Sequence, residues 1–206
     1  MENNMEFEYE YEKFLKDIQN LFKMEEEKNS LSLDGNLMIG LKKKNYLDDD
    51  VIKRDFSLKT EAQLSIEEYL YLDLGKTKEI ILKKSFLERN NIPEEKLWDI
   101  AEKNVENDYI LSEMGSLMTI LTNKKFQCGA SALLSKKARK EICEKLGTTR
   151  FLVLPSSIHE ILIVDPLLYK EGENCIEGFT KMVKDVNKTQ VALEEQLEDK
   201  AFFVEL

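Results

Sequence analysis

The chain has 206 residues, a formal net charge of −10, one histidine and three cysteines, and 42% of its residues are hydrophobic. That composition supports a buried core and excludes a wholly disordered protein. The acidity argues against direct nucleic-acid binding, which needs clustered lysine and arginine. No apolar run approaches the roughly 18 residues of a membrane helix, and the first residues are acidic, so we expect neither a membrane span nor a signal peptide. Three cysteines cannot form a complete disulfide framework, which predicts free thiols and a cytoplasmic location.

The N-terminal segment is both acidic and amphipathic. Residues 1–28 hold nine acidic and four basic side chains, an excess of five negative charges. Apolar residues recur every three or four positions over 7–22, which predicts a helix. Its charged side is either a solvated face or an acidic surface for a basic protein partner, presented by Glu6, Glu10 and Asp17. Its aromatic stripe would pack on the body of the chain or join two copies in a homodimer through residues 7–22.

The next part of the chain is less regular. Leucines and isoleucine alternate over 31–41 around an Asp-Gly pair, which predicts a hairpin. Residues 51–75 are compatible with either a helix or a strand. Residues 79–87 are predicted as a strand that ends at a turn of two asparagines. Pro93 then begins a helix, and Glu94 and Glu95 in its first turn favour that helix end.

The second half has clearer start and stop signals. Apolar runs at 117–121 and 128–134 flank a polar turn and predict an antiparallel strand pair. Ser135 is a predicted N-cap and Gly147 a predicted C-terminal stop for the helix between them.

The last third adds strands at 150–154 and 160–164, a helix over 176–186 and a closing strand at 201–206. Together the elements predict an α+β fold, a mostly antiparallel sheet with helices packed on one face. We divide the chain into a divergent region, 1–77, and an α+β unit, 78–206, which can equally form one continuous domain.

The single histidine lies in the string Pro155-Ser156-Ser157-Ile158-His159-Glu160. A hydrolase would use Ser156 or Ser157 as nucleophile and His159 as base. On an extended segment Ser157 and His159 share a face, whereas Glu160 points the other way. There is no GxSxG motif. The alternative interpretation is a turn in which the serine hydroxyls bond backbone amides.

Metal and cofactor motifs are missing from the sequence. His159 and Glu160 begin like HExxH, but position 163 is isoleucine. With one histidine and no cysteine cluster we predict no metal site. The eight glycines form neither a GxGxxG motif nor a P-loop, so we predict no cofactor. Cys128 is interpreted as a small buried thiol rather than a nucleophile.

A family resemblance rests on Asn123, Gly129, the Pro155–Glu160 string and Asn187 in this order. With these motifs, residues 78–206 resemble an uncharacterised bacterial family, one of the domains of unknown function. The resemblance implies no activity, and residues 1–77 match it poorly. It marks the following positions as signature residues, among which Asn123 and Asn187 are candidate binding residues: Asn123, Gly129, Pro155, Ser156, Ser157, His159, Glu160 and Asn187.

Two classes of function follow. The first is a non-enzymatic protein-interaction module, for example an acidic inhibitor or adaptor from a phage or mobile element that binds a basic host or defence protein. The alternative is a small hydrolase that uses Ser156 or Ser157 with His159.

Overall fold

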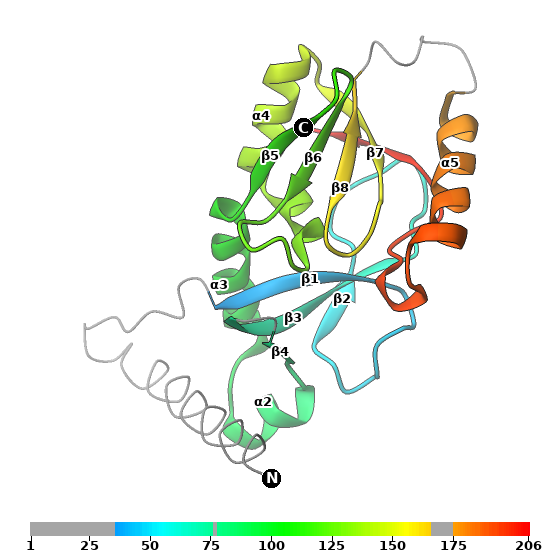
Figure 1. Ribbon diagram of the computed structural model, residues 1–206. Coiled ribbons are helices and arrows are strands. Elements are labelled where there is room, and N and C mark those ends of the chain that lie inside the picture. Colours follow the sequence, from blue (N-terminus) through cyan, green and yellow to red (C-terminus); the bar gives the residue numbers. More distant parts are fainter. Residues whose placement is uncertain (1–35, 76–77, 166–174) are drawn as a thin grey trace.

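The computed structural model describes residues 36–75, 78–165 and 175–206, which form two antiparallel sheets with helices around them (Figure 1). The predicted α+β class is confirmed. The predicted helix over 7–22, with Glu6, Glu10 and Asp17, lies outside the described residues. No helix in the described part of the chain is long and apolar enough to cross a bilayer.

The first sheet is built around one long strand, β3 (Ile66–Gly75). On one side β3 pairs with β1 (Leu37–Lys43), which contains the second arm of the predicted hairpin; the first arm lies outside the described residues. On the other side it pairs with β2 (Lys53–Asp55) and β4 (Lys78–Ile81), one after the other. The segment 51–75, compatible with helix or strand in sequence, therefore contributes two strands.

The strand predicted over 79–87 is wrong in its second half. Strand β4 ends at Ile81, and α2 (Lys84–Asn90) takes the following residues into a short helix. The carboxylate of Asp50 accepts hydrogen bonds from the backbone nitrogen and the hydroxyl of Ser85, at 3.0 and 2.8 Å. This acceptor at the start of the helix comes from a distant loop, so local sequence did not reveal it.

Helix α3 (Glu94–Asn107) covers one face of the first sheet. It begins after Pro93, as predicted, and it buries Leu97, Ala101 and Val105 in one core with Leu37 and Ile39 of β1.

The second sheet has the strand order β5-β6-β8-β7-β9, with every neighbouring pair antiparallel. Its strands are β5 (Ile110–Met114), β6 (Met118–Thr122), β7 (Arg150–Leu154), β8 (Ile161–Val164) and β9 (Phe202–Glu205). The strands expected at 117–121, 150–154, 160–164 and 201–206 are confirmed.

Two helices pack on opposite faces of the second sheet. Phe151 and Val153 of β7 share a core with α4 (Lys136–Leu146), whereas Leu152 and Leu154 share one with α5 (Cys175–Gln190). The arrangement therefore differs in detail from helices on a single face. As predicted, the Ser135 hydroxyl caps α4 by accepting a bond from the Ala138 amide at 3.0 Å, and Gly147 ends it with φ +64°.

The predicted strand over 128–134 is wrong. Residues Gly129–Leu134 form a 3-10 helix, η1, entered through Cys128 with φ +51°. Strand β6 pairs instead with β5 and β8. A short apolar run is buried in either conformation, so its composition could not distinguish them. Because η1 contacts β1, α3 and β6, it lies between the two sheets. The division suggested at residue 77 falls between β3 and β4, which are neighbours in one sheet.

Candidate functional site

Most of the signature residues gather where two turns of the second sheet meet. One turn, residues 122–129, follows β6, and the other, residues 155–160, joins β7 to β8; we call them the paired turns. Thr122 Oγ1 donates to the His159 carbonyl at 2.8 Å, and the Ala130 amide donates to the Ile158 carbonyl at 3.1 Å. Two hydrogen bonds therefore join the turns directly, one from a residue before Gly129 in the chain and one from the residue after it.

Asn123 organises the first of the paired turns. It is 2% exposed, and its Nδ2 donates to the Gln127 carbonyl at 2.7 Å. Its Oδ1 accepts from the amides of Lys125 and Gln127, both at 3.2 Å. Asparagine is well suited to this role because its side chain can satisfy the backbone of its own turn. These bonds engage both ends of the Asn123 amide within the protein.

Gly129 allows the close approach of the turns. A Cβ at this position would lie 2.2 Å from Thr122 Oγ1, 2.6 Å from the Asn123 nitrogen and 2.7 Å from the His159 carbonyl oxygen. No side chain fits such a gap, so the contact between the paired turns requires glycine.

His159 has a hydrogen bond at one ring nitrogen and a carboxylate near the other. Its Nδ1 accepts a hydrogen bond from the Cys128 amide at 3.1 Å, and its Nε2 lies 3.5 Å from Glu195 Oε1. Because a backbone amide can only donate, Nδ1 acts as the acceptor, which assigns the ring hydrogen to Nε2 facing Glu195. Glu195 belongs to η3 (Leu193–Glu195), so the ring connects the start of η1 to the C-terminal segment.

Of the two serines, Ser157 contacts the histidine, and only at the histidine's backbone. Ser157 Oγ accepts from the His159 amide at 3.0 Å, and the Ser157 amide donates to the Glu160 carbonyl at 3.2 Å. Within the described residues, neither the hydroxyl of Ser156 nor that of Ser157 bonds the His159 ring, and the Glu160 carboxylate does not either. The structure therefore places the four residues together without the hydroxyl–imidazole hydrogen bond that activates a serine.

Cys128 is buried, and its thiol faces acceptors. Its Sγ donates to Glu79 Oε2 at 3.1 Å and lies 3.9 Å from the Tyr69 hydroxyl. Burial, reinforced by the Glu79 carboxylate, raises the pKa of this thiol to about 12. The thiol is protonated at neutral pH, which is the opposite of an activated nucleophile.

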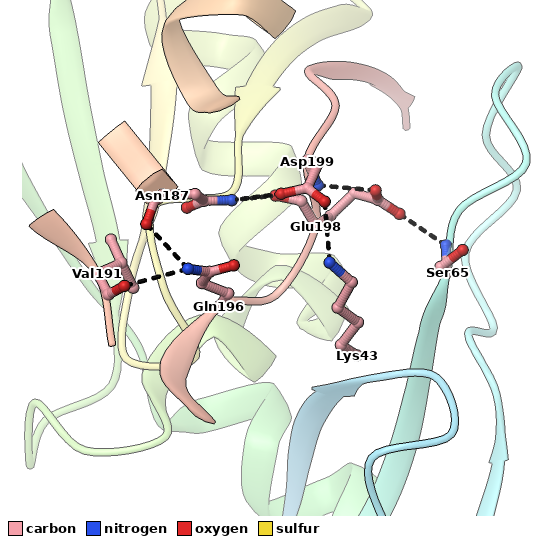
Figure 2. A network of polar contacts seen from close by, with 7 residues as sticks. All are labelled: Lys43, Ser65, Asn187, Val191, Gln196, Glu198 and Asp199. Atoms are coloured by element: carbon pink, nitrogen blue, oxygen red, sulfur yellow. Dashed lines mark hydrogen bonds and ion pairs between the residues drawn. The ribbon is translucent and has the colours of Figure 1, made fainter. Parts of the chain in front are cut away.

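Asn187 lies in a second network, which joins α5 to the C-terminal segment (Figure 2). Its side-chain Nδ2 donates to the Glu198 carbonyl at 3.0 Å and to Asp199 Oδ1 at 2.9 Å. Its backbone carbonyl accepts a hydrogen bond from Gln196 Nε2 at 2.8 Å. The side chain thus fastens α5 to the loop that leads into β9.

The same loop is bonded to the first sheet. The Glu198 side chain, 4% exposed, accepts from the Ser65 amide at 2.6 Å, and Asp199 Oδ2 accepts from Lys43 Nζ at 2.9 Å (Figure 2). Hydrogen bonds from Lys43 and Asn187 hold the pKa of Asp199 below its ordinary value. No local signal marks these acidic residues, because a charged run such as Glu194 to Asp199 resembles an ordinary solvated segment.

The described residues offer no cluster of three or more histidine, cysteine, aspartate or glutamate side chains that could hold a metal ion.

Comparison with known proteins shows that this block is similar to a family of unknown function. Residues 107–204 match a family of unknown function, DUF5688, and the match spans the second sheet, α4 and α5. All eight signature positions fall inside it, whereas the resemblance expected from residue 78 is supported only from residue 107 onward. No curated protein and no solved structure matches the chain. From β5 to β9 the chain is therefore similar to DUF5688, a family that brings no known function.

Proposed function

We propose that this chain is a non-enzymatic protein-interaction module whose acidic N-terminal segment binds a basic protein partner. Residues 1–28 carry half of the net negative charge, together with a stripe of aromatic residues. Charge of this kind accelerates association and selects the sign of the partner, while apolar side chains supply affinity. An inhibitor or adaptor carried by a phage or mobile element fits this description.

The observation that supports the proposal most strongly is the set of contacts around the His159 ring. The only histidine of the chain has an amide donor at Nδ1 and a carboxylate at Nε2. Cys128, whose amide makes the first of these bonds, keeps a protonated thiol. The side chains best able to perform acid, base or nucleophilic chemistry therefore act as parts of the scaffold, and the hydrolase alternative gains no support from any particular contact.

A charge-neutralised variant tests the proposal. In Glu6→Gln/Glu10→Gln/Asp17→Asn the segment 1–28 loses three negative charges and keeps its size and its apolar stripe. We expect the wild-type chain, immobilised, to retain a basic protein from a cell lysate at about 50 mM salt and to release it at about 500 mM, because salt screens exposed charges. The identified protein, once purified, should bind the variant at least tenfold more weakly.

The matched control removes the same charge elsewhere. Glu88, Glu95 and Asp99 are exposed on α2 and α3. Glu88→Gln/Glu95→Gln/Asp99→Asn should bind the purified partner like the wild type if the segment 1–28 is the docking surface. Equal weakening of both variants would attribute binding to net charge alone, and an unaffected N-terminal variant would contradict the proposal directly.

A further inference from the structure

We propose that a pocket between the first sheet and helices α3 and α4 binds a small organic monocarboxylic acid, with Arg139 of α4 as the residue that anchors the carboxylate. This site is separate from the paired turns and independent of the proposed protein partner.

The pocket lies where β1, the loop after β2, α3, η1 and α4 meet. Its volume is about 270 Å³, near the lower end of the range for small-molecule sites. Four aliphatic side chains provide an apolar lining: Ile39, Leu58, Val105 and Leu134. Ser57 and Arg139 add polar groups to the wall. Three further lining residues, Arg54, Glu102 and Glu106, are charged, so the pocket is a partly open site of mixed polarity.

Arg139 is held in place and retains unused donors. Its Nη1 donates to the carbonyls of Leu133 and Leu134 at 2.8 and 2.7 Å, which fixes the guanidinium at the end of η1. Its Nε is buried and has no hydrogen-bond partner. Within the described residues Arg139 forms no ion pair. Its Nη2 makes no hydrogen bond within the described residues, so this half-buried guanidinium has a donor left for an anion that enters the pocket.

The other cation of the wall is already neutralised. Arg54 donates from Nε to Glu68 and from Nη2 to Glu102, both at 2.7 Å. It also stacks on the ring of Trp98, with the guanidinium carbon 4.0 Å from the ring centroid. Arg54 therefore closes one side of the pocket without offering a free charge.

Two carboxylates line the pocket, and both already have hydrogen-bond partners: Glu102 is bonded to Arg54, and Glu106 to the start of α4. Glu106 accepts from the amides of Lys136 and Lys137 at 2.7 and 3.1 Å, where it caps the first turn of α4. Its charge is compensated by that helix end rather than by a hydrogen bond from Arg139.

These charges define the ligand. One guanidinium with spare donors matches one carboxylate, whose two oxygens fit the planar fork of arginine. A phosphate or a dicarboxylate would bring a second negative charge close to Glu102 and Glu106, which line the same pocket. The aliphatic lining requires an apolar body. A compact acid of the size of benzoate or hexanoate meets all three conditions.

Binding can be measured by nuclear magnetic resonance on the full chain. We would titrate ¹⁵N-labelled protein with benzoate and hexanoate, and with the neutral isosteres benzamide and hexanamide. At least one acid should cause a saturable shift of the Arg139 Nε–H signal, and its amide should bind at least tenfold more weakly because the charged hydrogen bonds are lost. Absence of saturation by both acids up to about 50 mM, well above the Kd of a usable site, would overturn the proposal.

Three variants locate the site. Arg139→Gln should weaken acid binding at least tenfold, whereas Lys140→Gln, the same loss of charge at an exposed position beside it, should not. Ser57→Trp should fill the pocket and abolish binding while Arg139 and its two carbonyl bonds stay in place, so it decides the question if Arg139→Gln does not fold. Wild-type affinity in either pocket variant, or equal affinity for acid and amide, would refute the assignment.

Discussion

Replacing Gly129 with alanine should destabilise the protein by about 2 to 4 kcal/mol. The new Cβ would meet Thr122 Oγ1 at 2.2 Å, the Asn123 nitrogen at 2.6 Å and the His159 carbonyl oxygen at 2.7 Å. The last two atoms are backbone, so no side-chain rotation relieves them, and the paired turns must separate. The loss of stability combines the strain that remains from overpacking with the loss of the hydrogen bond from Thr122 to the His159 carbonyl.

Urea unfolding followed by circular dichroism measures this loss, since the free energy falls linearly with denaturant. Gly178→Ala is the matched control. It lies within α5, and a Cβ there would meet no atom within 4 Å. Relief of the glycine penalty in a helix should stabilise the control by about 0.5 to 1 kcal/mol. A Gly129→Ala protein within about 0.5 kcal/mol of the wild type, an ordinary value for a neutral surface change, would refute this account of the turns.

Three other outcomes are expected. With the other two cysteines replaced by alanine, native Cys128 should resist a thiol reagent at about pH 8, because its pKa lies near 12; rapid labelling would contradict this. Asp199, whose pKa is lowered first by the hydrogen bond from Lys43, contributes stability that is present above the ordinary value of 3.8 and lost as pH falls through the lower folded value. Asp199→Asn should therefore be less stable at neutral pH and lose less stability below about pH 4 than the wild type, and parallel stability curves would count against the pairing. A fragment of residues 78–206 lacks the central strand of the first sheet and should show no cooperative unfolding transition; such a transition would establish it as an independent domain.

The elements that sequence predicted well carry their signals locally. Ser135 and Gly147 bracket α4 with a hydroxyl cap and a left-handed stop, and both lie within a few residues of the bonds they make. Likewise, Pro93 lies directly before α3, at the N-cap, where its missing amide hydrogen breaks no helical bond. Such signals need no knowledge of the rest of the fold.

The elements that sequence missed depend on distant partners. The run 128–134 became a 3-10 helix because it is inserted between two sheets, where small residues and one glycine permit close contact. The residues after β4 became helical beside the Asp50 carboxylate of an earlier loop. Neither partner could be identified from a single sequence, so the periodicity of short apolar runs was not decisive.

The candidate site divides in the same way. His159 and Asn123 stood out in sequence as part of an ordered signature, but their roles were set by the Cys128 amide, by Glu195 and by the backbone of the 122–129 turn. Pocket residue Arg139 gave no sequence signal, because one arginine in a basic helix resembles any other solvated cation. Its unusual state is visible only from the carbonyls around it.

The polar character of the signature has a structural cause that affects how variants should be interpreted. The paired turns bring backbone amides and carbonyls close together in a partly buried contact, where each such group needs a hydrogen-bond partner. Asn123, His159 and Asn187 supply such partners. Loss of activity in a His159 variant would therefore follow first from a smaller folded fraction, and only a comparison at equal amounts of folded protein separates that effect from lost chemistry. By the same reasoning, function should be sought outside the paired turns, in the acidic segment 1–28 and at the pocket beside Arg139.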